Sequence, residues 1–588
     1  MSLLHALHHG GWLRHVDLSL AKSMLRVRAD TPDWVLAAAA LASRALANGH
    51  SQLPLAQVEE LLLEIGSEHA APALPPLDDW RQMLEHSPWV GESGVLVLED
   101  SALSLRRYWQ YERRLAQTIA ARLATLARVC PPVTDARMTQ LFGIVRDTPA
   151  ELAARAALRL PLLLLTGGPG TGKTTAVTRT LVLFAEQFAA AAPGRRARIA
   201  LAAPTGKAAA RLAESVRENL AQLMADGSID AELAHALPTE ASTLHRLLGW
   251  QRGKIDFRHN AAQPLPVDLV IVDEASMIDL PLMCKLFEAV PPEATLLLIG
   301  DRHQLPSVET GDVLAALCDA ATQPGSALAA HRVHLAHSHR QREDTDVAAL
   351  ADLLRDGDSG AAIDGLARQA FRGVTWQQGS DRALADAVLA QALPAYRALL
   401  AAGDVTAALV MARNFRVLTA VREGAAGSQT LNAIIASALD PTRRGDTFFS
   451  GRLVLVNENS YRHQLFNGDI GIVWPDEHGE LRVWFGAEGG PRAWLPAALP
   501  GHESAFALTV HKAQGSEFER VFLALPEHGA RVISRELLYT GLTRCRRQVT
   551  LWASEAVLRA AIERKAQRWS GLARRLGASP APAMLRMD

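Results

Sequence analysis

Residues 162–175 place an apolar run directly before a glycine-rich loop, in the order Leu-Leu-Leu-Leu-Thr-Gly-Gly-Pro-Gly-Thr-Gly-Lys-Thr-Thr. The loop fits the pattern G-x-x-x-x-G-K-[ST], in which backbone N–H groups surround phosphate oxygens at the positive end of a helix. A chance match in a glycine-rich turn is disfavoured, because a strand-like run precedes the loop and a helix-like run follows it. The chain is therefore predicted to bind a nucleoside triphosphate. The predicted binding residues are Gly167, Gly168, Pro169, Gly170, Thr171, Gly172, Lys173, Thr174 and Thr175.

Two side chains of this loop have chemical roles in the prediction. Lys173 is expected to reach the β- and γ-phosphates, and the Thr174 hydroxyl is expected to ligate Mg²⁺. Lysine is rare in the chain, since only seven of its 61 basic residues are lysines. A retained lysine indicates a need for a compact ammonium rather than a planar guanidinium. Lys173, Lys207 and Lys512 all fall inside the motifs described below.

Bulk composition limits the class of protein. A chain of 588 residues is expected to hold about three to five domains. Its net charge of −1 excludes a global basic field, so any contact with nucleic acid must be local. The four cysteines are far apart, which disfavours a disulfide framework or a zinc ribbon. No apolar run approaches the roughly 18 residues of a membrane span, so we expect a cytoplasmic protein with no membrane partner.

The pattern of apolar runs predicts an α/β protein with two parallel-sheet lobes. Strands are expected at 161–165, 198–203, 268–272 and 295–299, and another near 408–411. Short alternating runs between Gly451 and Leu499 predict a small inserted β-barrel. The predicted divisions are a helical N-terminal domain at 1–125, a first lobe at 126–345, a second lobe at 346–450 and 500–575, the β insertion at 451–499, and a tail at 576–588.

Polar residues follow two of the predicted strands of the first lobe. Asp273 and Glu274 come directly after Leu-Val-Ile-Val. Asp273 is expected to hold Mg²⁺, and Glu274 to orient and deprotonate the attacking water. Gln304 follows the next strand, where its amide can sense the γ-phosphate and relay its loss. Each motif alone is also compatible with ordinary polar residues at strand ends, and the glycine loop upstream favours function.

A second set of residues suits a single-stranded sugar-phosphate backbone. Short hydroxyls, lysines and helix N-termini are typical of such contacts. The alternative is that these residues only cap helices. The predicted DNA-binding residues are Thr205, Lys207, Thr243, His245, Thr509, His511 and Lys512.

Two arginines are candidates for fingers that reach the nucleotide across a lobe interface. Arg340 ends the first α/β region, and Arg544 lies in the segment Leu-Tyr-Thr-Gly-Leu-Thr-Arg-Cys-Arg-Arg. Such a finger contributes on the order of 10³–10⁵ in rate. Because the chain contains 54 arginines, the motif context is what selects these two.

The ordered set GGPGTGKTT, APTGKAAARL, TLHRLLG, IVDEAS, GDRHQLPSV, SHR, NGDIGIV, LTVHKAQGSEF and LYTGLTRCRR resembles the superfamily 1 DNA helicases, and most closely the RecD family. The resemblance covers nearly the whole chain. It implies two RecA-like lobes, an SH3-like fold for 451–499, and ATP with Mg²⁺ as cofactors. It further implies an ATP-driven 5′→3′ helicase subunit of exodeoxyribonuclease V, whose N-terminal domain docks on the beta and gamma subunits. Such a heterotrimer unwinds DNA from double-strand ends in recombinational repair, with nuclease activity on a partner.

One position departs from the family pattern. Many relatives carry an adenine-reading glutamine about 17 residues before the glycine loop, where this chain has Ala150 beside Glu151. Gln140 lies too far upstream to replace it. We therefore expect weaker discrimination among nucleoside triphosphates.

Three other functions are compatible with part of the sequence. A stand-alone RecD-like helicase usually carries a longer N-terminal extension, whereas about 160 residues precede the loop here. A protein-remodelling ATPase would share the glycine loop but not the motifs at 508–519 and 537–547. A catalytically dead scaffold is disfavoured by the intact Lys173, Thr174, Asp273, Glu274 and Arg544.

Overall fold

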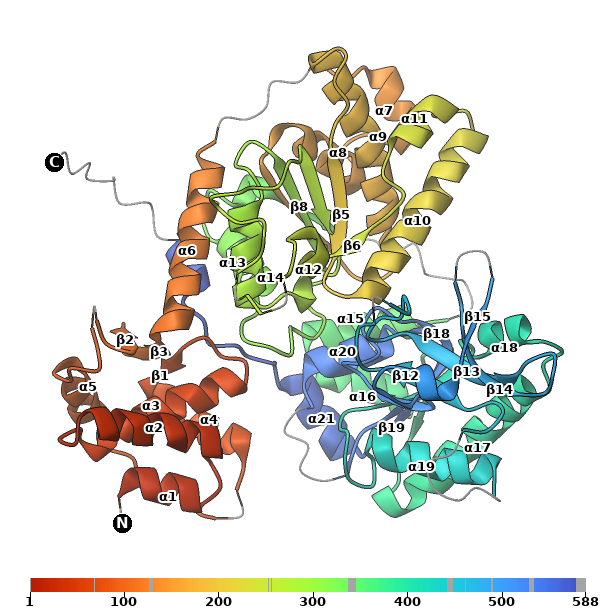
Figure 1. Cartoon of the computed structure of the whole chain (residues 1–588). Helices are drawn as coiled ribbons and strands as arrows, with labels where there is room; N and C mark the ends of the chain where they lie inside the picture. Colours follow the sequence, from red (N-terminus) through yellow and green to blue (C-terminus); the bar gives the residue numbers. More distant parts are fainter. Residues whose placement is uncertain are drawn as a thin grey trace.

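The computed structural model describes residues 2–67, 69–91, 93–125, 131–251, 253–254, 256–336, 345–441, 448–460, 462–487, 490–527 and 533–577. The N-terminal part packs helices around a small antiparallel sheet of order β1-β3-β2 (Figure 1). Its central helix is alanine-rich and buried, which lets the neighbouring helices approach closely. The elements are α1 (Leu3–His9), α2 (His15–Val27), α3 (Asp33–Ala47), β1 (Leu53–Pro54), α4 (Val58–Ile65), α5 (Leu77–Glu85), β2 (Leu96–Glu99) and β3 (Ala102–Leu105).

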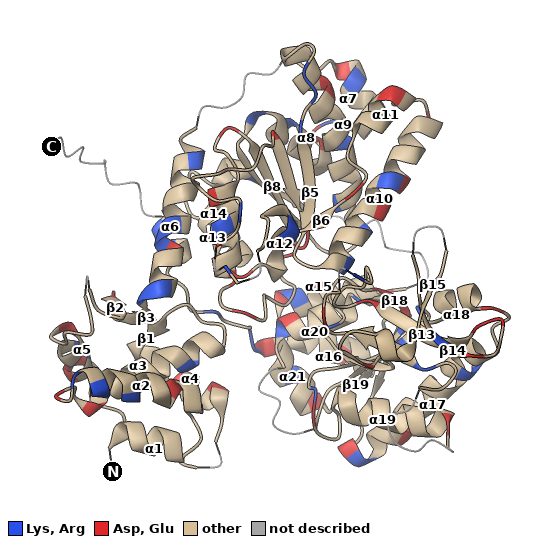
Figure 2. Ribbon diagram, viewed as in Figure 1, with Lys and Arg blue, Asp and Glu red and all other residues tan. Residues whose placement is uncertain are grey.

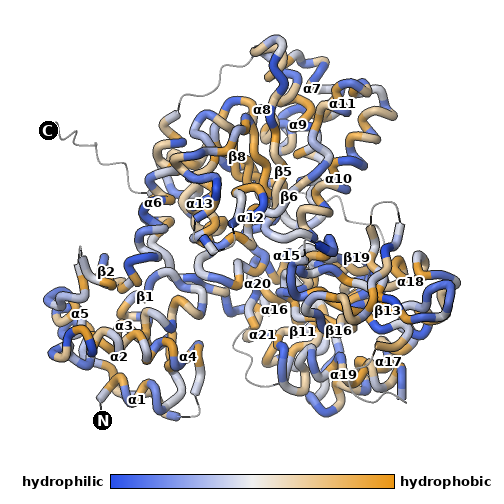
Figure 3. The backbone as a smooth tube through the Cα atoms, viewed as in Figure 1, coloured by the Kyte–Doolittle hydropathy of each residue, from blue (hydrophilic) through white to orange (hydrophobic). Residues whose placement is uncertain are grey.

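The first lobe is built on a six-stranded parallel sheet of order β6-β5-β7-β8-β4-β9. Its central strands are buried on both faces, as expected for a parallel sheet covered by helices, and Figure 3 shows them as apolar. The strands are β4 (Leu162–Gly167), β5 (Ile199–Ala203), β6 (Ser242–Thr243), β7 (Leu269–Val272), β8 (Thr295–Gly300) and β9 (Arg332–Leu335). The helices are α7 (Asp135–Phe142), α8 (Pro149–Arg159), α9 (Lys173–Ala191), α10 (Gly206–Ala225), α11 (Ala231–Ala236), α12 (Leu244–Leu247), α13 (Leu280–Ala289) and α14 (Val313–Thr322).

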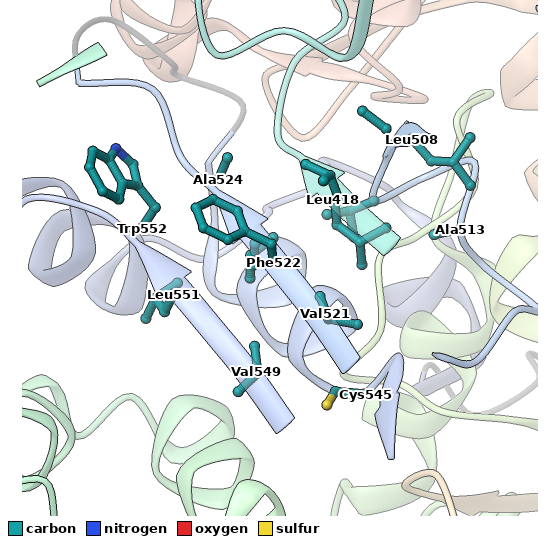
Figure 4. Close-up of a cluster of buried hydrophobic side chains, with 14 of the residues drawn as sticks. Leu418, Leu508, Ala513, Val521, Phe522, Ala524, Cys545, Val549, Leu551 and Trp552 are labelled. Carbon is teal, nitrogen blue, oxygen red and sulfur yellow. The ribbon is translucent and has the colours of Figure 1, made fainter. Parts of the chain in front are cut away.

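The second lobe has a five-stranded parallel sheet of order β10-β19-β18-β11-β17. Figure 4 shows its buried cluster, to which Leu418, Phe522 and Leu551 belong. The strands are β10 (Val374–Gln377), β11 (Phe415–Thr419), β17 (Ala507–Thr509), β18 (Phe518–Ala524) and β19 (Cys545–Trp552). The helices are α15 (Val347–Asp356), α16 (Ser359–Ala367), α17 (Asp381–Leu400), α18 (Val405–Met411), α19 (Ser428–Leu439), α20 (Arg535–Leu542) and α21 (Glu555–Glu563).

The prediction of an α/β protein with two parallel-sheet lobes is confirmed, but the strand expected near 408–411 is wrong. That segment is α18, and the strand begins at Phe415. Asp404 caps the helix by accepting a hydrogen bond from the Ala407 N–H at 2.8 Å. The short apolar run fits a helix or a strand by its periodicity, and capping by the Asp404 carboxylate favours the helix.

A separate antiparallel sheet of order β15-β14-β13-β12-β16 is inserted within the second lobe. Its strand β16 pairs with β12 through Ser504, so the sheet continues past the predicted boundary at 499. The strands are β12 (Leu453–Val456), β13 (Ile470–Pro475), β14 (Leu481–Phe485), β15 (Arg492–Trp494) and β16 (His502–Ser504).

Helix α6 (Arg106–Leu123) joins the N-terminal part to the first lobe (Figure 1). Near its end, the buried Arg122 guanidinium donates to the carbonyls of Pro161, Val290, Pro291 and Ala294 at 2.5–3.3 Å. Burial lowers the pKa of Arg122 to about 10. The carbonyls of Pro161 and Pro291 also accept from backbone N–H groups. Within the described ranges, those of Val290 and Ala294 accept only from Arg122. This arginine therefore ties α6 to the sheet of the first lobe.

The end of the described chain returns to the N-terminal part. Helix α22 (Leu572–Gly577) lies against α14 and α6. Just before it, the Trp569 ring stacks on His50 with ring centroids 4.0 Å apart, and the Ser51 N–H donates to the Trp569 carbonyl at 2.9 Å. The C-terminal segment therefore braces the N-terminal part against the first lobe. None of the described helices has the length and apolar character needed to cross a membrane.

Candidate nucleotide site between the two lobes

The glycine loop occupies the turn between β4 and α9. Gly170 and Gly172 have φ angles of +76° and +80°, a left-handed conformation that favours glycine. Helix α9 begins at Lys173 and has no side-chain cap, so its first N–H groups face the loop at the positive end of a long helix. The Lys173 ammonium donates to the Gly167 and Gly168 carbonyls at 2.7 and 2.8 Å. This arrangement provides an anion site lined by backbone N–H groups and one ammonium.

The acidic pair lies at the end of the neighbouring strand β7. Burial and the adjacent Glu274 carboxylate raise the pKa of Asp273 to about 6, and the ammonium of Lys173 opposes this shift. Glu274 has φ and ψ of 51° and 42°, a left-handed conformation that is unusual for a residue with a side chain. Its N–H donates to the Asp273 carboxylate at 2.8 Å. Strained backbone of this kind is often found at functional sites, where it aims a side chain.

A third loop follows β8 and carries Gln304, which is buried. The Gln304 Nε2 donates to the Asp301 carboxylate at 3.4 Å. The next residue, Leu305, is held by the second lobe at both backbone groups. Its N–H donates to the Thr540 Oγ1 at 2.8 Å, and its carbonyl accepts from the Gln514 Nε2 at 3.0 Å. The loop predicted to sense the nucleotide is therefore also a contact between the lobes.

Sequence reasoning missed Tyr539, which lies on α20 of the second lobe. Its hydroxyl donates to the Asp301 Oδ2 at 2.9 Å. A Cβ atom added to Gly168 of the glycine loop would lie 3.0 Å from the same hydroxyl. The residue stands inside the segment 537–547, but nothing in the sequence indicates its partner, which is 238 positions away.

Arg544 follows the same helix and is buried, with only 3% of its surface exposed. Its Nε donates to the Thr540 carbonyl at 3.2 Å, and its Nη1 to the Ser516 carbonyl at 3.4 Å. These contacts hold the guanidinium in the second lobe, beside the residues that contact Leu305. The other predicted finger, Arg340, lies outside the described residues. The assignment of both arginines as fingers stays a prediction.

The three predicted DNA-contacting threonines all cap turns or helices. Thr205 Oγ1 accepts from the Ala208 N–H at 3.2 Å, and Thr243 Oγ1 from the Arg246 N–H at 3.3 Å. Thr509 Oγ1 accepts from the Lys512 N–H at 3.4 Å. Capping leaves the remaining lone pair of each hydroxyl available, so these contacts are compatible with a second partner.

The two predicted DNA-contacting histidines have different surroundings. His245 is exposed, and its ring lies edge-on to Phe257 with centroids 5.7 Å apart. His511 is partly buried, and this burial lowers its pKa. Burial therefore favours the neutral imidazole in this structure.

Lys207 lies where the first lobe meets the β insertion and the second lobe. Its Nζ donates to the Ser516 Oγ at 2.5 Å and to the Gly468 carbonyl at 3.3 Å, and burial lowers its pKa to about 7. One helical turn later, Arg211 pairs with Glu517 at 3.3 Å. The lysine therefore joins three parts of the chain in this structure.

Lys512 is also engaged with the protein, since its Nζ contacts the Glu503 carboxylate at 2.5 Å and the Asn457 side chain at 3.3 Å. Figure 2 shows acidic residues interspersed with basic ones over both lobes. A single strand bound here would have to compete with these ion pairs.

Comparison with known protein families agrees with this arrangement. The model for the RecBCD enzyme subunit RecD, N-terminal domain, matches residues 9–103. An AAA domain model matches residues 150–310, and the UvrD-like helicase C-terminal domain matches residues 504–552. The latter two fall on the parallel-sheet lobes that meet at the glycine loop.

Several proteins that are similar over most of the chain are RecD subunits. The RecBCD enzyme subunit RecD of Mycobacterium tuberculosis (strain CDC 1551 / Oshkosh) is 38% identical, over 98% of this chain and 96% of the relative. That of Haemophilus influenzae is 33% identical, over 88% and 87%. The ATP-dependent RecD2 DNA helicase of Deinococcus radiodurans is 30% identical, over 85% of this chain and 62% of that protein. A crystal structure of Pif1 helicase from Candida albicans, at 14% identity, covers 71% of this chain and 97% of that one with a TM-score of 0.37.

Two parallel-sheet lobes, a glycine loop, acids at a strand end and a Gln304 loop held by the second lobe, with the matching family models, define an ATP-dependent helicase of the P-loop class. Within this class of helicases, the chain is 33–38% identical to RecD proteins over most of the length of both sequences. The chain belongs to the RecBCD enzyme subunit RecD family.

Proposed function

We propose that this chain is the RecD motor of an exodeoxyribonuclease V heterotrimer, which unwinds DNA from double-strand ends during recombinational repair in the cytoplasm. The N-terminal domain would dock on the beta and gamma subunits, and a partner subunit would supply the nuclease activity. The 5′→3′ direction of movement follows from the family resemblance. The observation that carries the proposal is the contact between the Gln304 loop and the second lobe, because it links a nucleotide site to the relative position of two lobes.

The proposed chemistry assigns each loop a role in ATP hydrolysis. The backbone N–H groups of 168 and 170–174 and the Lys173 ammonium would bind the β- and γ-phosphates. Thr174 and Asp273 fit Mg²⁺, since a hydroxyl and a carboxylate are oxygen ligands of the kind that Mg²⁺ takes beside phosphates. When bound, Mg²⁺ would neutralise charge that develops on the phosphate oxygens. Glu274 would orient the attacking water and accept its proton.

Hydrolysis would be coupled to movement through the cleft between the lobes. The phosphates would attract Lys173 from the first lobe and Arg544, with Arg340, from the other side, so that ATP favours closure and product release favours opening. A single strand would cross both lobes near Thr205, Thr243, His245 and Lys512. The antiparallel sheet at 451–504 would form the SH3-like insertion of the family, beside this path.

The second candidate is a stand-alone helicase like RecD2 of Deinococcus radiodurans, to which the chain is also similar. The match of residues 9–103 to the RecD N-terminal domain favours the subunit. Co-purification of the native protein separates the two, since the subunit is expected to bring two larger chains with it and the stand-alone enzyme none.

The test is unwinding of duplexes with a 5′ or a 3′ single-stranded tail, by the chain alone and with its co-purified partners. We expect ATP-dependent unwinding of the 5′-tailed duplex, and none by a Lys173→Gln control. Unwinding of only the 3′-tailed duplex would refute the direction. A lack of single-strand-stimulated ATP hydrolysis in every preparation would refute the motor itself.

A further inference from the structure

The hydroxyl of Tyr539 connects the second lobe to two separate loops of the first. The side chain is 4% exposed, and its hydroxyl donates to the Asp301 Oδ2 at 2.9 Å. The same oxygen lies against the glycine loop, where a Cβ atom on Gly168 would approach it to 3.0 Å. A single polar atom of the second lobe is therefore hydrogen-bonded to the loop after β8 and lies next to the phosphate-binding loop, where a side chain at 168 would meet it.

Asp301 links Tyr539 to Gln304, the residue predicted to sense the γ-phosphate. Its Oδ2, which accepts from Tyr539, also accepts from the Gln304 Nε2 at 3.4 Å. Its Oδ1 accepts from the His303 N–H at 3.0 Å, which fixes the carboxylate to its own loop. The orientation of the Gln304 amide therefore depends on a carboxylate that is shared with the opposite lobe.

The surroundings of Tyr539 keep its hydroxyl a hydrogen-bond donor. Burial and the Asp301 carboxylate raise the pKa of Tyr539 well above its usual value, so the phenol stays protonated throughout the working pH range. The His303 ring lies edge-on to Tyr539, with ring centroids 6.3 Å apart. The neighbouring Thr540 binds the Leu305 N–H, so α20 and the sensing loop are held in a fixed register.

We propose that Tyr539 is a positioning residue of the ATPase site, which orients Asp301, and through it Gln304, only when the second lobe is seated on the glycine loop. The inference rests on the proposed ATP-driven function. A hydrogen bond weakens steeply once donor and acceptor separate by more than a few tenths of an ångström beyond contact, so opening of the cleft breaks the Tyr539–Asp301 bond. Gln304 is then free to rotate, and the site turns over only in the closed arrangement.

The test compares Tyr539→Phe with a matched control, Tyr396→Phe. Tyr396 is buried in the same lobe, and its hydroxyl donates to the Phe506 carbonyl at 3.1 Å, within the core of that lobe. Both changes remove one buried phenol hydroxyl; that of Tyr396 also lies 3.5 Å from the Phe415 carbonyl of the same core. Steady-state ATP hydrolysis is measured with saturating oligo(dT), together with thermal unfolding of each variant.

We expect Tyr539→Phe to lower kcat about ten- to a hundredfold, since a hydrogen bond to a carboxylate is lost. The KM for ATP should stay within about twofold, because the phosphate-binding groups are unchanged. Tyr396→Phe should lower the unfolding temperature and leave kcat within about twofold. Equal kcat values in the two variants, or a change confined to KM, would overturn the positioning role.

Asp301→Asn provides a second measurement, made on the acceptor side of the Tyr539–Asp301 hydrogen bond. If Tyr539 acts through Asp301, Asp301→Asn lowers kcat to a similar degree, and the double variant loses no more than the larger single loss. Independent losses that multiply in the double variant would refute the route through Asp301. A wild-type chain without DNA-stimulated hydrolysis would instead refute the proposed function, so the two failures are distinguishable.

Discussion

Glu274 offers a test that separates the strain of its backbone from the catalytic role of its side chain. A residue with a Cβ atom in the left-handed region costs about 1–2 kcal/mol relative to the right-handed one. Glycine removes this cost, but its greater freedom in the unfolded chain costs about 0.5–1 kcal/mol. At the φ of 51° found here, Glu274→Gly should therefore be more stable than Glu274→Ala by about 0.5–1 kcal/mol.

Comparing the glycine variant with the alanine variant isolates the energetic cost of the left-handed backbone at position 274. Both variants lack the carboxylate and its repulsion of Asp273. For a unit of about 200 residues, a difference of 1 kcal/mol shifts the unfolding temperature by about 2–4 °C. Thermal unfolding should therefore place the glycine variant about 1–4 °C above the alanine variant. ATP hydrolysis should be lost in both, since a general base contributes about 10²–10⁴ in rate.

The control is Glu274→Gln, which retains the side-chain volume and the backbone strain while removing the base. It should bind nucleotide and fail to hydrolyse it. A glycine variant that unfolds below the alanine variant would show that Glu274 is not strained. Hydrolysis within a few-fold of wild type in any of the three would show that Glu274 is not the base.

The remaining predictions concern four other positions. Lys173→Gln should abolish DNA-dependent hydrolysis without changing the circular dichroism spectrum, and substantial remaining turnover would contradict its assignment. Arg122→Met should lower the free energy of unfolding by about 2–5 kcal/mol, since two buried carbonyls lose their donor. A loss below about 0.5 kcal/mol in urea titrations is typical of a surface substitution, and it would show that Arg122 does not hold α6 to the first lobe. Lys512→Ala should weaken single-strand binding and reduce the salt slope by about 0.7, whereas an unchanged slope would mean no phosphate contact. With Ala150 in place of a glutamine, GTP should compete with ATP more effectively than in a glutamine-bearing relative, and an equal ATP preference would refute this.

The parts of the site that are local in sequence could be predicted. An apolar strand, two left-handed glycines and a helix start are consecutive, so the position of Lys173 at the start of α9 follows from the motif alone. The ends of parallel strands meet at one edge of a sheet, which predicts Asp273 and Gln304 in the same region. These inferences need only short-range pattern and the geometry of parallel sheets.

The parts that depend on contacts between distant segments could not be predicted. Nothing in the sequence around Tyr539 or Asp301 indicates that they form a hydrogen bond, because the bond exists only once the two lobes pack together. Lys207 is predicted to contact phosphate, and nothing in the sequence indicates the contacts that it makes here with the second lobe and the β insertion. Sequence identifies a residue's chemistry, whereas its partner is set by packing.

The proposal of an ATP site completed by both lobes depends most directly on Arg544, the predicted finger that lies within the described residues. The decisive measurement is the kcat of single-strand-stimulated ATP hydrolysis by Arg544→Ala, with ATP affinity measured in parallel. A finger supplied from the second lobe predicts a loss on the order of 10³-fold or more, with nucleotide still bound. A kcat for Arg544→Ala within about threefold of the wild-type kcat corresponds to less than about 1 kcal/mol of transition-state stabilisation. That result would show that the second lobe does not complete the site.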